Sequence, residues 1–179
     1  MLLRIAPDMF TNPQYECVTI RQVYEEIART PKFKTKYPWI RELRGGIKFL
    51  SATEAESQKA RSFYDAITAL NDNATINTRT QRIFDLSRED RWIIACAAAH
   101  AYAISSGDGD LRDFAVQQFD ASIIFPLEVI NLWIAKNLIA WNDEKQACLK
   151  AWADKNEHAQ PFQAKKEFRE LTGMKYEGN

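Results

Sequence analysis

Acidic side chains are the residues of this chain whose types and spacing could do chemistry. The two histidines, His100 and His158, have no evident nucleophile partner in the sequence. Carboxylates without a histidine or cysteine suit hard cations that prefer oxygen, such as Mg²⁺ and Mn²⁺. We therefore predict a divalent metal site. Its candidate ligands are Glu25 or Glu26, Asp90, Asp108 and Asp110.

Most of these carboxylates also have a purely structural explanation. Asp90 lies three residues after Ser87, where it could complete a capping box at the start of a helix. Asp110 is suited to be the N-cap of a helix that starts at Leu111. Asp108 lies between two glycines just after a predicted strand and gains no obvious cap there. It is therefore the acidic residue that most strongly suggests chemistry.

Residues 29–48 form a basic segment with interleaved aromatic residues. Seven basic residues and one acidic residue give this segment a net charge of +6. Its basic residues are Arg29, Lys32, Lys34, Lys36, Arg41, Arg44 and Lys48, and its aromatic residues are Phe33, Tyr37 and Trp39. Basic side chains attract phosphates, and aromatic rings stack on unpaired bases, so the segment predicts RNA binding. The alternative is a solvated loop whose aromatic residues pack on the core.

The elements that must position these residues are predicted from hydrophobic period and capping residues. Helices are predicted over residues 20–28, 53–70, 87–101, 111–119 and 127–172, the last with a break near Pro161. Short strands are predicted over residues 17–18, 102–106 and 122–125. Alternating strands and helices are typical of a mostly parallel central sheet with helices on both faces. The predicted fold is a three-layer α/β/α domain over residues 1–140, followed by a C-terminal helical extension over residues 141–179 that packs on it.

Composition and charge limit the class of protein. Lys plus Arg and Asp plus Glu are balanced at 24 each, which excludes a uniformly basic nucleic-acid binder. The longest run without charges or strong turn formers, residues 92–104, is shorter than the roughly 18 residues of a membrane span. The N-terminus has too few apolar residues for a secretory signal, and three widely spaced cysteines indicate reduced thiols. We therefore expect a cytoplasmic protein.

The second half of the sequence resembles a PIN-domain ribonuclease. In that family an Asp opens an alanine-rich helix, and a later strand ends in the pattern Thr/Ser-x-Asp-x-Asp-Phe. Here Asp90 opens such a helix and Asp108 follows 18 residues later. Ser106 takes the Thr/Ser place of the pattern, and Leu111 takes the Phe place.

The resemblance extends to a stretch near the N-terminus. Residues 18–27 resemble the family's strand followed by a helix that bears a Glu just before an Ile or Leu. This pattern favours Glu26 over Glu25. Together the similar stretches cover residues 16–30 and 86–130.

The resemblance implies a metal-dependent endoribonuclease that hydrolyses phosphodiester bonds in single-stranded or structured RNA. Glu26, Asp90 and Asp108 would be catalytic and would hold Mg²⁺ or Mn²⁺, with Asp110 as a direct or water-mediated ligand. Ser106 would support a ligand carboxylate or a substrate phosphate. PIN proteins are frequently toxins held inactive by a small antitoxin, so the resemblance implies such a partner. Trp133, Trp141 and Trp152 in the C-terminal part of the chain would suit a homodimer or partner surface, and packing in the core is the alternative that is more usual for such residues.

One departure from the family concerns its first strand, which ends in a metal-binding Asp. Residues 1–6 resemble the stretch just after such an Asp. We therefore expect that the N-terminus is truncated or misassigned, or that Asp8 substitutes for the missing ligand. Two alternatives stay open: a catalytically impaired RNA-binding or regulatory protein of the same fold, and a phosphatase-like Mg²⁺ enzyme that uses Asp108 and Asp110.

Overall fold

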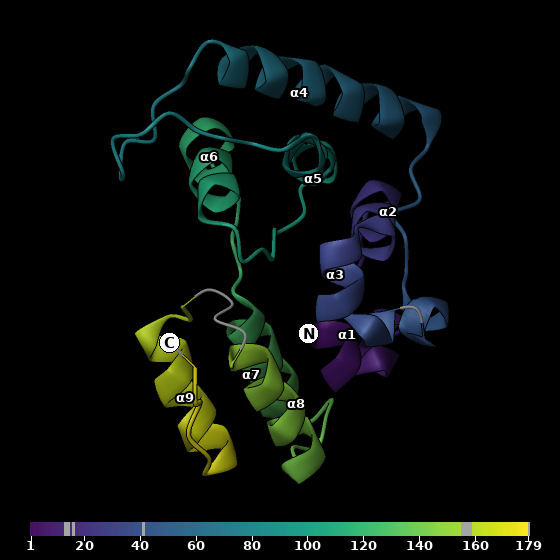
Figure 1. Cartoon of the computed structure of the whole chain (residues 1–179), viewed down its shortest axis with the longest axis vertical. Helices are drawn as coiled ribbons and strands as arrows, with labels where there is room; N and C mark the ends of the chain where they lie inside the picture. The colour runs from purple at the N-terminus through teal and green to yellow at the C-terminus, as the bar shows by residue number, and fades with distance from the viewer. Residues whose placement is uncertain (13–14, 16, 41, 155–158, 179) are drawn as a thin grey trace. The chain divides into compact units, whose positions relative to one another are not determined.

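The computed structural model describes residues 1–12, 15, 17–40, 42–154 and 159–178, and this part of the chain is helical (Figure 1). The chain divides into two compact units. Unit 1 comprises Met1–Thr19, Glu26–Lys48 and Phe125–Asn179, and unit 2 comprises Ile20–Glu25 and Phe49–Ile124. The helix α2 (Arg21–Arg29) begins in unit 2 and ends in unit 1.

Three helices build unit 2, and each begins at a residue whose side chain caps it. They are α4 (Glu54–Asp72), α5 (Arg88–His100) and α6 (Gly109–Phe119). Thr53 and Ser87 form capping boxes at the starts of α4 and α5. A capping side chain accepts a hydrogen bond from a backbone N–H that the helix itself leaves unpaired. The predicted starts of these two helices are thus confirmed.

The core of unit 2 is formed where α5 meets α4 and α6. Alanines on α5 keep its buried face small, which lets α4 cross closely over it, and α5 is seen nearly end-on beneath α4 in Figure 1. The rings of Phe84 and Phe114 pack edge to face at 5.0 Å. The most deeply buried members of this core are Ile67, Phe84, Leu86, Ile94, Ala95, Leu111, Phe114 and Ala115.

Unit 1 combines short helical turns from the N-terminal part of the chain with three longer helices from its C-terminal part. The short elements are α1 (Leu2–Ile5), η1 (Pro7–Phe10), α3 (Pro31–Lys36), η2 (Pro38–Ile40) and η3 (Glu42–Gly46). The longer helices are α7 (Pro126–Ala135), α8 (Asp143–Ala153) and α9 (Phe162–Thr172). The predicted break near Pro161 is confirmed, because Pro161 directly precedes α9. The helical stretch predicted from residue 127 is also interrupted between Ala135 and Asp143, which the sequence does not predict.

Helices α7 and α9 lie side by side in unit 1 (Figure 1). The buried amide of Asn131 on α7 donates to the carbonyl oxygen of Ala164 at 2.8 Å and to a carboxylate oxygen of Glu167 at 3.1 Å. Trp133 and Phe168 are almost fully buried, and the ring of Trp141 packs edge to face on Phe168 at 5.1 Å. These aromatic residues, on α7, on α9 and in the connection before α8, therefore serve the core of unit 1.

The predicted three-layer α/β/α fold is wrong, because the described residues contain no strand beyond isolated bridges. The segments 102–106 and 122–125 do meet in parallel, but only through one bridge between Ile104 and Ile123. Ile104 N–H donates to Ser122 at 2.8 Å, and Ile124 N–H donates to Ile104 at 3.0 Å. A sheet needs three or more paired strands with a shared apolar face, and no third segment joins this pair in the described part.

Among the described helices, none combines the length and the apolar character that crossing a lipid bilayer requires. Cys17, Cys96 and Cys148 are not in disulfides, as their spacing predicts.

Candidate functional site

The Asp90 carboxylate is part of the capping box at the N-terminus of α5. Its Oδ2 accepts hydrogen bonds from the backbone N–H of Ser87 at 3.0 Å and from the Ser87 hydroxyl at 2.6 Å. In return, Asp90 N–H donates to Ser87 Oγ at 3.1 Å. This reciprocal pair satisfies backbone donors that would otherwise lack a partner. The structural explanation of Asp90 that the spacing offers is therefore confirmed.

Asp108 is the N-cap of α6, which the sequence does not predict. Leu111 N–H donates to Asp108 Oδ1 at 2.9 Å, and Asp108 N–H donates to the hydroxyl of Ser106 at 3.1 Å. The prediction that Asp110 caps this helix is wrong, since Asp110 already lies in its first turn. The helix starts at Gly109, two residues before the predicted start, because Asp108 supplies a cap strong enough to begin it at a glycine.

Asp90 and Asp108 are close enough for their charges to interact. Burial raises the pKa of Asp90, hydrogen bonds from Ser87 oppose this rise, and the negative charges of Asp108 and Glu89 add to it. Two of the predicted ligands thus share one neighbourhood in unit 2, at the starts of α5 and α6. Glu26, the third predicted ligand, belongs to unit 1.

The donor set does not fit a metal centre in the described part of the chain. No group of three or more His, Cys, Asp or Glu side chains there could hold a metal ion. Asp90 and Asp108 accept hydrogen bonds from backbone N–H groups, which are roles that a helix start alone explains. The predicted ligand set of Glu26, Asp90, Asp108 and Asp110, and Mg²⁺ or Mn²⁺ as a cofactor, stay predictions.

The basic segment places lysines on both sides of an aromatic pair. At 100° per residue, Phe33 and Tyr37 follow each other along one side of α3 and its C-cap. Lys32 and Lys36 lie on one flank of this pair, and Lys34 lies on the other. Lys32 and Lys34 are exposed, and the two rings are half-buried. The arrangement leaves partly exposed rings between cationic groups.

The aromatic residues of the segment form a continuous series. The rings of Phe33 and Tyr37 stack with centroids 6.2 Å apart and planes inclined by 28°. Trp39 follows edge to face on Tyr37 at 6.0 Å. Lys36 Nζ lies 5.4 Å from the centroid of Tyr37, and Lys32 Nζ lies 6.0 Å from that of Phe33. These distances are within the range of cation–π attraction, so the lysines stay beside the rings.

One side of this aromatic series faces other elements of unit 1, namely α1 and α8. Tyr37 and Trp39 line a narrow pocket together with residues of α1 and α8, among them Arg4, Cys148 and Trp152. The guanidinium of Arg4 lies 6.0 Å from the centroid of Trp39. The alternative of aromatic packing therefore accounts for part of the burial of these residues, and each of them is half-buried.

A cleft of about 570 Å³ lies at the end of the basic segment, also in unit 1. Gly45, Gly46 and Lys48 line one part of it, and Phe10 and Tyr15 line another. A Cβ added at Gly45 would meet no heavy atom within 4 Å, so the cleft is open at that position. The sequence does not predict this cleft, and its only local signal there is the Gly45-Gly46 pair.

Three further residues of the basic segment, all arginines, are predicted to bind nucleic acid, and the structure describes the side chain of one of them. Arg29 is exposed at the end of α2. Arg41 lies outside the described residues, and Arg44 belongs to η3 but its side chain is not described.

No family is shown for this chain. Comparisons with models of protein families, with curated proteins and with solved structures find no match. The resemblance to PIN domains is therefore wrong as an assignment, because those domains are built on a central parallel sheet that the described residues lack. The assignments as a nuclease and as the toxin of a toxin–antitoxin pair rested on this resemblance, and they lose that support.

Proposed function

We propose that the chain binds single-stranded nucleic acid through the basic segment, residues 29–48, with RNA as the strand that the sequence predicts. The aromatic pair on α3, flanked by lysines, supports this function best. Lys32 and Lys34 are exposed on opposite flanks of the Phe33 and Tyr37 rings. A strand laid along these rings would bring its phosphates toward lysines on either side.

Two physical contributions favour a single strand over a duplex. Lysines that neutralise phosphates release condensed counterions, which supplies affinity whatever the base sequence. Aromatic rings stack on unpaired bases, and each such contact contributes about 1–3 kcal/mol. In a duplex the bases are already stacked on each other, so the second contribution is lost. The half-buried rings of Phe33, Tyr37 and Trp39 offer surfaces for this stacking without leaving the core of unit 1.

The cleft at Gly45 gives the strand a place for a flipped base. Phe10 and Tyr15 contribute aromatic surface, and Lys48 is an exposed cation at its edge. Glycine has no side chain, so a ligand can approach the backbone closely at these two positions. The function is binding, and no cleavage step is assigned to these residues.

A direct experiment compares a fluorescently labelled oligouridine with the same strand annealed to oligoadenosine. Fluorescence anisotropy is measured at equal salt with the full chain. We expect tighter binding of the single strand, because only it has unpaired bases for the rings. Equal affinity for both forms would contradict base stacking, and no binding to either would contradict the proposed function.

A further inference from the structure

A separate pocket of about 250 Å³ lies within unit 2. Trp92, Cys96 and His100 line it from α5, where their spacing of four residues places them on one face of the helix. Arg61 lines it from α4, and Arg21 and Gln22 line it from the start of α2. The pocket therefore has its own walls, independent of the basic segment in unit 1.

The pocket combines an apolar floor with a cationic edge. Trp92 stacks on Tyr64 at 4.3 Å, which holds the indole in place as part of the wall. Arg21 and Arg61 are both exposed, and the guanidinium of Arg21 lies 4.8 Å from the centroid of Phe49. No acidic residue is among the described residues that line the pocket. Its charge is thus suited to an anion.

His100 shows an unsatisfied polar group in the wall of this pocket. Its side chain is only 6% exposed, and Nδ1 lies 3.6 Å from a carboxylate oxygen of Glu56. The Glu56 carboxylate is itself held by the backbone N–H and hydroxyl of Thr53, both at 2.7 Å. Nε2 of His100 is buried and has no hydrogen-bond partner in the described part of the chain. A buried polar atom without a partner costs about 1–3 kcal/mol, so this part of the pocket wall is not fully satisfied by the protein's own groups.

The other polar groups of the wall do not suggest covalent chemistry. Burial raises the pKa of the Cys96 thiol, so the reactive thiolate is disfavoured at neutral pH. Cys96 therefore adds apolar surface, and Gln22 adds hydrogen-bonding capacity at the edge. Apolar surface with a few polar groups is typical of pockets that bind small molecules.

We propose that this pocket binds a small planar organic anion, whose carboxylate or phosphate lies between Arg21 and Arg61 and whose ring lies against Trp92. The bound molecule lies beside the imidazole of His100, which lines the pocket. A cavity of about 150 Å³ accommodates benzene, so this pocket has room for one or two fused rings with an anionic group. The inference does not depend on nucleic-acid binding by unit 1.

Proton NMR of the full chain provides the test, because the chain has only two histidines. The Cε1–H signal of His100 is identified by its loss in His100→Gln. Indole-3-carboxylate is titrated as the probe, with indole as the uncharged control. We expect a saturable shift of the His100 signal with indole-3-carboxylate and a much weaker effect with indole.

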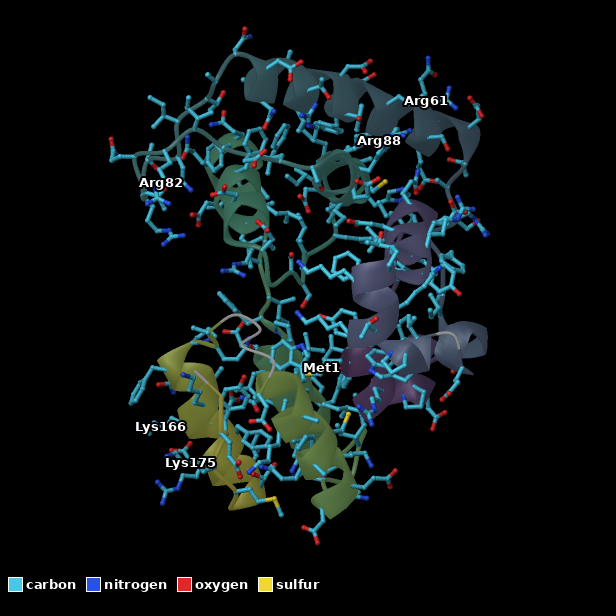
Figure 2. All side chains as sticks on the ribbon, in the orientation of Figure 1. Met1, Arg61, Arg82, Arg88, Lys166 and Lys175 are labelled. Atoms are coloured by element: carbon cyan, nitrogen blue, oxygen red, sulfur yellow. The ribbon has the colours of Figure 1, made fainter. Side chains whose placement is uncertain are left out.

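Matched arginine variants test the anionic contact. Arg61 and Arg82 are both exposed arginines of unit 2, labelled in Figure 2, and only Arg61 lines the pocket. Losing one charge-assisted contact weakens binding by about tenfold or more, so Arg61→Gln should do so and Arg82→Gln should not. Competition by inorganic phosphate would assign the anionic group to a phosphate, and its absence to a carboxylate. No saturable shift, equal binding of indole, or equal affinity of the two variants would overturn the proposal.

Discussion

The ring of Tyr37 stacks on the ring of Phe33 at 6.2 Å, and lysines lie on both flanks of the pair. Such a pair has two uses: its inner side stabilises unit 1, and its outer side is accessible to a ligand. Variants that change the aromatic surface, the cleft and the charge in turn distinguish the structural use from the use in binding nucleic acid.

Phe33→Leu removes an aromatic face and keeps an apolar side chain of similar size. We expect the affinity for oligouridine to fall by about 1–3 kcal/mol, because one stacking contact is lost. Phe162→Leu is the matched control, since Phe162 is 81% exposed on α9 of the same unit and lies outside the basic segment. Fluorescence anisotropy measures both variants, and equal affinities would argue against stacking on Phe33.

Gly45→Val fills the open cleft at the end of the basic segment. The added side chain meets no heavy atom within 4 Å of its Cβ, and Gly45 does not have the positive φ that favours glycine. We therefore expect little change in the melting temperature and a clear loss of affinity for oligouridine. Gly45→Ala, which fills less of the cleft, should lie between the wild type and Gly45→Val. Unchanged binding by both variants would exclude the cleft from the interface.

Asp113→Ala should destabilise unit 2 at neutral pH. The amide of Asn77, which is 1% exposed, donates to Asp113 Oδ2 at 2.8 Å, and Arg79 donates to the same oxygen. The variant leaves the Asn77 amide unpaired, at a cost of about 1–3 kcal/mol. Urea unfolding at pH 7 measures the difference, with Asp85→Ala on the exposed surface of unit 2 as the control.

The pH dependence of this effect follows from the pKa of Asp113. Burial acts to raise this pKa, but hydrogen bonds from Arg79 and Asn77 and the charge of Arg79 outweigh burial and lower it. A lowered pKa in the folded state means that the carboxylate stabilises the fold above the unfolded pKa of about 3.9. This stabilisation is lost as the pH falls through the lower, folded-state pKa. The difference between wild type and Asp113→Ala should therefore shrink in acid, and a constant difference would contradict this assignment.

Asp108→Ala should lower the stability of unit 2 by about 1 kcal/mol, because Asp108 caps α6. Asp108→Asn should keep most of the stability, since asparagine is an equally good N-cap. Thermal unfolding with and without Mn²⁺ separates a cap from a metal ligand. A rise in melting temperature that Mn²⁺ causes in the wild type but not in Asp108→Asn would support a metal site at this carboxylate.

The starts of α4 and α5 could be predicted because their signals are local. Thr53 and Ser87 each lie three residues before an acidic residue, and both form the capping boxes that this spacing predicts. The strands could not be predicted in the same way, because strand pairing depends on residues far apart in the sequence. Ile104 and Ile123 lie in apolar segments that suit strands, yet they form a single bridge.

For the candidate sites too, features formed by neighbouring residues could be predicted, and features formed by residues far apart in the sequence could not. The basic segment is continuous in the sequence, so the order of residues alone reveals its charge and its aromatic residues. The capping role of Asp108 is hidden because the helix it caps begins with a glycine, a residue that ordinarily disfavours helix. The pocket at His100 could not be predicted, because it exists only where α4 and α5 come together with the start of α2.

The most direct test of nucleic-acid binding is the salt dependence of affinity for oligouridine. Each phosphate contact to a single strand contributes about 0.7 to the slope of log K against log salt. Lys32→Ala/Lys34→Ala should therefore weaken binding and reduce this slope by about 1.4. Lys166→Ala/Lys175→Ala, which removes two exposed lysines at or near α9 of the same unit (Figure 2), should leave the slope unchanged. Equal slopes for the two double variants would contradict the basic segment as the nucleic-acid interface.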